Sequence, residues 1–309
     1  MRKYLNFLML SIILLAGPAH ATETDKLDVV ASFSILADLV AAVGGEHVRV
    51  QALVGPDQDA HGYQPRPSDA RKVGAAALVV ANGLGFDGWI ERLARSAGHP
   101  RPVLIASQGI PALHSQPEAE HEHDHDHAHR HTHGVDPHAW QDVANTIIYV
   151  RNITAGLTAA DPAHTAHYRA NAERYIAELQ ALDADIRRAL AALPAERRKV
   201  VTSHDAFGYF ERAYGLHFVA AHGVASNAEP SAQGIARLIR QIRAEKIPAA
   251  FLENVTDPRL VERIRNESGA RLGGTLYSDA LSAADGPAPT YIAMMRHNLA
   301  TLLGGLTAD

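Results

Sequence analysis

The chain contains no cysteine among its 309 residues. It therefore has no disulfide, no thiolate to bind a metal and no cysteine to carry a lipid, so a hydrophobic core must supply its stability. It also lacks a strong excess of charge, because the formal net charge is −5. Since no basic patch with interleaved aromatic residues occurs, we expect no nucleic-acid partner. The hydrophobic content of 47% is enough for a large core, in one large or two ordinary domains.

Long apolar runs are missing as well, except near the first residue. Arg2 and Lys3 precede the apolar stretch 5–16, and the tripeptide A-H-A follows it at 19–21. That order predicts an export signal over residues 1–21, whose apolar part is too short for a transmembrane helix. A buried N-terminal helix is the alternative. We therefore expect a periplasmic protein with no stable membrane insertion.

Strand patterns alternate with helical patterns along the rest of the chain. The expected strands cover 27–34, 48–54, 76–81 and 102–106 in the first part, and 199–203, 217–221, 249–253 and 273–277 in the second. Between the two parts, apolar residues at helical spacing continue from the D-P pair at 161–162 to Leu190, as in one long helix. This alternation predicts an α/β fold of two Rossmann-like lobes with parallel-type sheets, joined by a long spine helix. The expected parts are an N-terminal lobe over 22–158, the spine over 159–193 and a C-terminal lobe over 194–309.

A long segment without apolar periodicity, 107–137, follows the fourth expected strand. Its part 114–133 is a His-rich loop, acidic overall, with a histidine at every second position from 121 onward. Alternate residues of an extended chain share one side, and imidazoles beside carboxylates bind zinc, so we predict weak auxiliary metal sites there. The auxiliary ligands are His121, His123, His125, His127, His129, His131 and His133. A solvated linker that binds metal only incidentally is the alternative.

Four other residues are candidates for one fixed metal site. His61, His138, His204 and Asp279 each fall in a loop at or shortly beyond the end of an expected strand. Ligands of open α/β sheets bind at that edge, so two facing lobes can bring these side chains to one point. Three imidazoles and one carboxylate form a closed tetrahedral shell suited to Zn²⁺. From their spacing alone, these histidines could equally be ordinary surface or core residues that bind no metal.

The residues around these positions resemble those of a known family. The chain is similar over 27–305 to the solute-binding proteins of bacterial zinc and manganese ABC importers. Seven segments carry the resemblance in the family's order: D-A-H-G-Y-Q-P-R-P-S-D, A-N-G-L-G-F-D-G-W-I, V-D-P-H-A-W, D-P-A-H-T-A-H-Y-R-A-N-A-E-R-Y, S-H-D-A-F-G-Y-F, L-Y-S-D-A-L-S and Y-I-A-M-M-R-H-N-L. The first, third, fifth and sixth segments imply that His61, His138, His204 and Asp279 are the metal ligands.

The resemblance also implies a cargo and partners. Manganese-type members usually carry glutamate at the third ligand position, so His204 favours Zn²⁺ as the transported ion. The fourth ligand varies among zinc members, so water is the alternative to Asp279. The implied partners are an ABC permease and its ATPase, with a periplasmic zinc donor or chaperone as a further one. We expect a monomer.

The sequence leaves three alternatives to a zinc carrier. A carrier of manganese or another divalent metal is the first alternative. A zinc hydrolase needs an open coordination position, which Asp279 would fill, and the chain has no H-E-x-x-H motif, so we predict that the protein is not an enzyme. A histidine-rich zinc buffer without transport is the third alternative.

Overall fold

The computed structural model describes residues 26–114, 134–223 and 232–307. The expected export signal, 1–21, and the alternating histidines at 121–133 lie outside the described residues. Within the described ranges, no helix combines the length and the apolar composition needed to cross a membrane.

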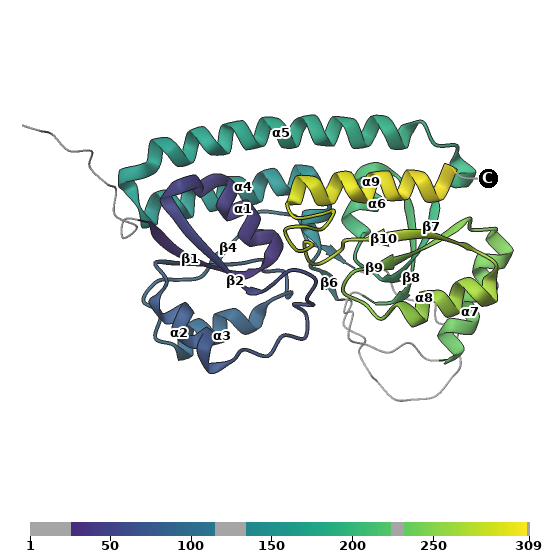
Figure 1. The fold of residues 1–309 in the computed structure, drawn as a ribbon, viewed down its shortest axis with the longest axis horizontal. Coiled ribbons are helices and arrows are strands. Elements are labelled where there is room, and N and C mark those ends of the chain that lie inside the picture. Colours follow the sequence, from purple (N-terminus) through teal and green to yellow (C-terminus); the bar gives the residue numbers. More distant parts are fainter. Residues whose placement is uncertain (1–25, 115–133, 224–231, 308–309) are drawn as a thin grey trace, which may run out of the picture.

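The first half of the chain forms a parallel sheet with the strand order β2-β1-β3-β4. Its strands are β1 Leu27–Phe33, β2 Val48–Val54, β3 Leu78–Ala81 and β4 Leu104–Ile105. The connecting helices are α1 Ser34–Gly44, α2 Pro67–Ala75 and α3 Gly88–Ser96. Figure 1 shows α1 on one face of this sheet and α2 and α3 on the other. The central strands β1 and β3 are therefore almost continuously apolar, as expected for a parallel sheet covered on both faces.

The second half repeats this arrangement with the strand order β10-β9-β7-β8, again parallel. Its strands are β7 Lys199–His204, β8 His217–His222, β9 Ala249–Glu253 and β10 Arg271–Leu276. The accompanying helices are α6 Gly208–Tyr214, α7 Ala232–Glu245 and α8 Pro258–Ser268. A bulge between Leu272 and Gly274 shifts the register of β10 against β9.

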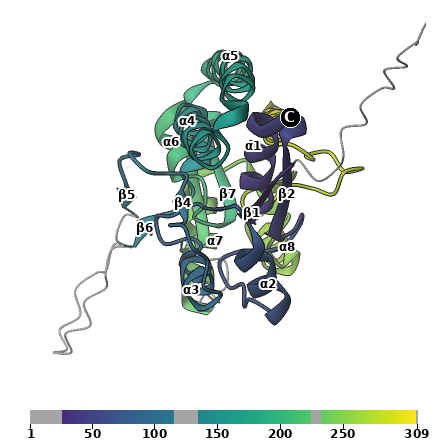
Figure 2. The ribbon, with the colours of Figure 1, turned by 90° about the vertical axis from the view of Figure 1, so that its left-hand side faces the viewer.

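Three further helices lie along the same side of both sheets: α4 Val143–Ala160, α5 Thr165–Ala191 and α9 Tyr291–Thr307. Helix α5 has 27 residues and is about 40 Å long. It packs on α1 and α4 of the first half and on α6 and α9 of the second, and so runs along the whole molecule (Figures 1 and 2). Most of the apolar positions that predicted it are buried, whereas Tyr175 is half-buried. The buried ones are Tyr168, Leu179, Leu182, Ile186 and Leu190. The predicted fold class, with parallel sheets and a long connecting helix, is confirmed.

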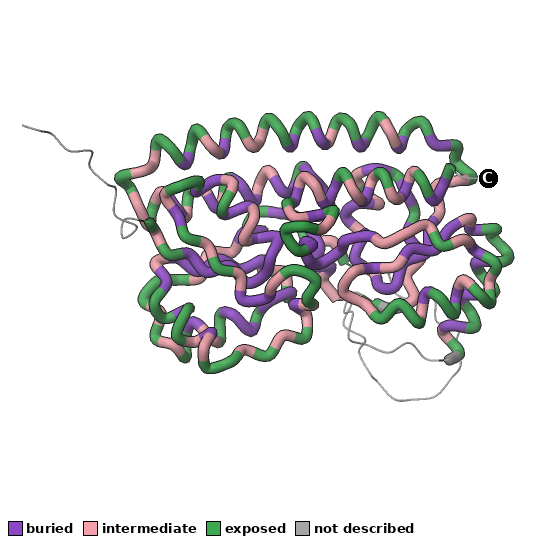
Figure 3. Tube along the Cα trace, viewed as in Figure 1, coloured by how far each residue is buried: buried purple, intermediate pink, exposed green. Residues whose placement is uncertain are grey.

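Short elements complete the chain. They are the 3-10 turns η2 Gly45–His47, η3 Ala139–Gln141, η4 Pro162–His164 and η5 Ala195–Arg197, and the antiparallel pair β5 Leu113–His114 and β6 Val135–Asp136. The lack of apolar periodicity over 107–137 gave no indication of these two strands. Each has only two residues, too few to show the period of a strand. The pair closes the base of the His-rich segment and fixes the position of the residues that follow β6. Figure 3 shows buried residues along the strands of both halves and in the region where the two halves meet.

Candidate metal centre

The four predicted ligands come from four segments at the ends of strands. His61 lies in the loop between β2 and α2, and His138 follows β6 directly before η3. His204 is the last residue of β7, and Asp279 lies shortly beyond β10. The structure brings these side chains from both halves of the chain to one place, where their ligand atoms all lie within 4.8 Å of one another.

The separations between individual atoms are those of ligands around one small ion. His61 Nε2 lies 3.2 Å from His138 Nε2 and 3.2 Å from Asp279 Oδ2. His204 Nε2 lies 3.1 Å from Asp279 Oδ2, and His138 Nε2 lies 3.4 Å from Asp279 Oδ1. Two ligand atoms bound tetrahedrally to zinc are about 3.3 Å apart, which follows from a bond length of about 2.0 to 2.1 Å. The cluster therefore has the size of a four-coordinate zinc shell.

Only one of the four side chains in this cluster has exposed surface. The side chains of His138, His204 and Asp279 are 0% exposed, and that of His61 is 8% exposed. Phe86 packs edge-on against the His61 ring, with 4.5 Å between ring centres. The cluster is thus a nearly closed site, and His61 is the ligand nearest the solvent.

Carboxylates hold two of the imidazoles from behind. His138 Nδ1 lies 2.7 Å from Asp136 Oδ1, and the same oxygen accepts the backbone N–H of His138 at 2.9 Å. Because the Nδ1 proton is directed at this carboxylate, Nε2 is left with the lone pair that faces the cluster. Gly208, at the start of α6, allows the backbone to pass close to Asp136, because a Cβ at that position would lie 2.7 Å from Asp136 Oδ2.

His204 has its own carboxylate, Glu253, at the end of β9. Glu253 Oε2 lies 2.7 Å from His204 Nδ1. Glu253 Oε1 accepts the backbone N–H groups of Ser203 at 2.8 Å and of His204 at 3.0 Å. The side chain of Glu253 is 0% exposed, so this carboxylate orients the ring from within the protein interior.

The charges in the cluster change the protonation of its members. Desolvation lowers the pKa of His204, but the carboxylates of Glu253 and Asp279 outweigh it and hold that pKa well above its ordinary value. Desolvation raises the pKa of Asp279, yet His204 and His138 hold it well below the usual range. Asp279 is therefore an anion deep inside the protein, which is the state that a cation requires.

Hydrogen bonds tie the segment of His138 to the segment of Asp279. The side chains of Trp140 and Gln141 both donate to the carbonyl oxygen of Ser278, at 2.9 and 2.8 Å. This double contact joins η3 of the first half to the loop after β10 of the second half, and so fixes the two ligands relative to each other.

The two carboxylates behind the rings come from different places in the sequence. Asp136 lies two residues before His138, which it contacts, whereas the carboxylate at His204 is the distant Glu253 and not the adjacent Asp205. Burial raises the pKa of Asp205, and Asp136 nearby adds to that rise. The pattern A-A-F-L-E, an acid at the end of an apolar strand, was the available signal for Glu253.

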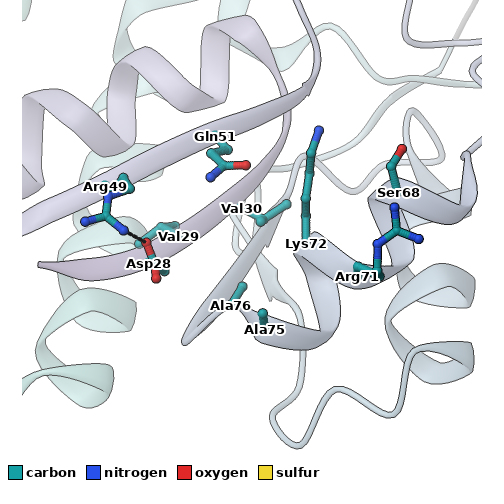
Figure 4. Close-up of a pocket in the computed structure, with 10 residues that line it drawn as sticks. All are labelled: Asp28, Val29, Val30, Arg49, Gln51, Ser68, Arg71, Lys72, Ala75 and Ala76. Carbon is teal, nitrogen blue, oxygen red and sulfur yellow. Dashed lines mark hydrogen bonds and ion pairs between the residues drawn. The ribbon is translucent and has the colours of Figure 1, made fainter. Parts of the chain in front are cut away.

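A separate pocket lies away from these ligands, between β1, β2 and α2. Its volume is about 440 Å³, and Figure 4 shows Arg49, Arg71 and Lys72 on its walls, with Arg49 paired to Asp28. None of the four candidate ligands lines it. The metal centre is a closed set of touching side chains and not this open pocket.

Comparison with known proteins gives matches along nearly the whole chain. The family model described as zinc-uptake complex component A, periplasmic (ZnuA), matches residues 29–305. The iron-binding protein YfeA of Yersinia pestis is 33% identical over 298 residues, covering 96% of this chain and 92% of that protein. The manganese-binding lipoprotein MntA of Halalkalibacterium halodurans is 32% identical over 308 residues, 98% of each. Among solved structures, the periplasmic zinc binding protein TroA from Treponema pallidum matches with a TM-score of 0.82 and 33% identity, covering 92% of this chain and 100% of that chain.

Proposed function

The chain belongs to the periplasmic zinc-uptake complex component A family, and on that premise we propose that it captures Zn²⁺ and delivers it to an ABC importer. Members of this family are metal-binding substrate-binding proteins of ABC transporters and not enzymes. An ABC permease and its ATPase are accordingly the partners. Zinc as the cargo, and the four side chains as its ligands, are the specific parts of the proposal.

The observation that carries the proposal is the convergence of three imidazole nitrogens and one carboxylate from both halves of the chain. Imidazole suits Zn²⁺ and copper, whereas Mn²⁺ is better served by carboxylate, carbonyl and water oxygens. Three neutral histidines and Asp279 leave a bound dication with a charge of +1. The two carboxylates behind the rings, Asp136 and Glu253, reverse that charge and stabilise the cation without entering its shell.

A carrier of manganese or iron is the second candidate, because relatives are named for those metals. One feature of the cluster also favours it: Asp279 directs both carboxylate oxygens at the histidines, Oδ2 toward His61 and His204 and Oδ1 toward His138. A bidentate Asp279 raises the coordination number above four, which suits ions that prefer more ligands than zinc does.

Capture and delivery follow from the position of the ligands. Because His61 is the most exposed of the four, we propose that the ion enters and leaves past its loop. Helix α5 packs on both halves, so we expect a small tilt or a loop movement on binding and not a wide hinge closure. We propose that the N-terminal lobe (22–158), the spine (159–193) and the C-terminal lobe (194–309) are the units that move. We propose that the His-rich run at 121–133 gathers zinc for this site, either from solution or from a periplasmic donor.

The metal preference is tested by the variant His204→Glu. This change replaces one nitrogen ligand by a carboxylate, so it should lower the affinity for Zn²⁺ and raise that for Mn²⁺. Competition titrations of the purified chain against chelators of known affinity would measure both constants. His138→Ala is the matched control, because it removes an imidazole without adding a carboxylate and should weaken both metals.

Two results would contradict the proposal. One is a wild-type chain that binds Mn²⁺ more tightly than Zn²⁺, which would favour the second candidate. The other is a His138→Ala or His204→Ala variant that keeps the tight zinc site, which would remove these residues from the ligand set.

A further inference from the structure

A second group of histidines lies at the outer end of the first half, away from the metal centre. His47 ends the turn η2, and His164 and His167 lie at the start of the long helix, in η4 and α5. The His47 ring is stacked on the His164 ring with 4.0 Å between ring centres, and it lies 4.5 Å from the His167 ring. Figure 1 shows the junction of α4 and α5 at this end of the molecule. The metal centre, in contrast, is formed by residues of both halves.

The three rings lie close together, although their donor atoms do not converge in the way seen at the metal centre, which is the one convergent group of at least three such donors among the described residues. Two imidazoles on one tetrahedral zinc have ring centres about 5 Å apart. In the metal centre the three ring-centre distances are 5.2, 5.4 and 6.0 Å. In the second group they are 4.0, 4.5 and 6.2 Å. The rings are thus as close together as those of the main site, although their planes are not yet turned toward a common point.

The second group also shares the carboxylate arrangement of the main site. His164 Nδ1 lies 2.6 Å from Asp161 Oδ2, and the Tyr168 hydroxyl donates to the same oxygen at 2.6 Å. A carboxylate at Nδ1 leaves Nε2 with its lone pair free for a metal, as Asp136 does for His138. His47 Nε2 is buried and has no hydrogen-bond partner among the described residues. Desolvation, and after it the neighbouring rings of His164 and His167, lower the pKa of His47, which favours the neutral form of the ring.

The backbone around the group is held in place. Asn171 Nδ2, on α5, donates to the carbonyl oxygen of Val43 at the end of α1, at 3.0 Å. Gly45, between Val43 and His47, has a φ of 56°, and a Cβ there would lie 2.9 Å from Asn171 Nδ2. The positive φ of Gly45 and the hydrogen bond from Asn171 to Val43 together hold the turn η2 against α5. The backbone therefore places His47 opposite His164 and His167.

We propose that His47, His164 and His167 form a second, weaker Zn²⁺ site, with Asp161 as the carboxylate that orients His164. Binding requires the stacked rings of His47 and His164 to turn by rotation about their side-chain bonds. The ring of His167 is exposed and turns freely, whereas the other two are half-buried and need a small adjustment. Because the rings must turn and the group is partly exposed to solvent, we expect its affinity for zinc to be lower than that of the closed metal centre. Its donor set of imidazoles selects zinc-like ions over Mn²⁺, Mg²⁺ and Ca²⁺.

The first experiment locates the ion. The full chain is crystallised with about three equivalents of ZnCl₂, and anomalous difference maps are recorded above and below the zinc absorption edge. The expected result is a peak within bonding distance of the nitrogens of His47 and His164, in addition to the peak at the metal centre. The two peaks are scored separately, so the absence of one leaves the other proposal standing.

The second experiment measures the site in solution. Histidine ring resonances of the ¹⁵N-labelled full chain, observed by NMR, should shift for His47, His164 and His167 once zinc exceeds one equivalent. His47→Gln and, separately, the exposed His167→Ala should each raise the zinc concentration needed for that shift by at least about 10-fold, the lower limit for loss of even an outer-shell partner. His217→Ala is the matched control, because His217 also has a carboxylate at Nδ1, Glu211 at 2.9 Å, but belongs to another surface.

Three results would overturn the proposal. They are the absence of a zinc peak at the group, ring resonances that stay unchanged up to ten equivalents of zinc, and a peak in the crystal without any change of the resonances in solution. If the added zinc binds only at the His-rich run, resonances of other histidines will shift while those of His47, His164 and His167 stay unchanged. That result would also count against this site.

Discussion

The change Glu253→Gln tests whether the buried carboxylate behind His204 sets the affinity of the metal centre. Glu253 uses its two oxygens differently: Oε1 accepts the N–H groups of Ser203 and His204, and Oε2 faces His204 Nδ1 at 2.7 Å. Glutamine keeps an oxygen in the first position and places an N–H₂ group in the second. Alanine would instead leave two buried N–H groups unpaired, at a cost of about 1–3 kcal/mol each, and would confuse affinity with stability.

The magnitude follows from the tautomer of His204. An amide N–H₂ facing Nδ1 favours the ring with its proton on Nε2, the atom that must bind the metal. Loss of an outer-shell partner typically lowers metal affinity about 10- to 100-fold. That range corresponds to about 1.4 to 2.7 kcal/mol of binding free energy. Because Glu253 both orients the ring and supplies negative charge at a fully buried position, we expect the upper part of the range.

The assay is a competition titration of zinc between the protein and a chelator of known affinity, with the fold checked by circular dichroism. Glu211→Gln is the matched control. Glu211 also places one oxygen at a histidine Nδ1, that of His217, and accepts a backbone N–H, that of Phe218, with the other. That pair is exposed and remote from the metal centre, so its change should leave zinc affinity unaltered. A Glu253→Gln protein that binds zinc within twofold of wild type would refute the reasoning.

Two further predictions concern the His-rich segment and the stability of the fold. Deleting residues 118–133 should leave one tight zinc per chain and lower only the number of weakly bound zinc ions; equilibrium dialysis with and without the deletion measures both numbers, and loss of the tight ion would contradict the expectation. Burial raises the pKa of Asp38 to about 6 from 3.8, against the opposing hydrogen bond from the Tyr291 N–H. The native state therefore holds the proton of Asp38 more tightly than the unfolded state, so ionising Asp38 costs stability as the pH rises from 4 through 6, by about 3 kcal/mol in total. Asp38→Asn should abolish this loss, which urea unfolding of the metal-free proteins at pH 4 and pH 7 would detect; equal pH slopes for both proteins would refute it.

Much of the fold could be predicted from the sequence because it depends on local patterns. Apolar strands bounded by turns, and the spacing of Tyr168, Leu179, Leu182 and Ile186, predicted the sheets and the long helix closely. The strand register could not be predicted, because neighbouring parallel strands pair through backbone groups that every residue carries. The two-residue strands β5 and β6 were missed because two residues are too few to show the period of a strand.

The candidate site divides in a similar way. His61, His138, His204 and Asp279 lie in segments with a recognisable local pattern, so the sequence by itself named them. Whether their nitrogens and oxygens meet at ligand distances depends on how the two sheets face each other, which only the tertiary structure decided.

The partners that lie behind the ligands and the second histidine group belong wholly to the tertiary structure. Glu253 reaches His204 because β9 pairs beside β7, and His47 reaches His164 because α5 packs on the end of α1. A local sequence pattern reflects interactions between residues that are close together in the chain. Contacts between residues far apart in the chain arise only when buried surfaces pack, so they appear only once the packing is known.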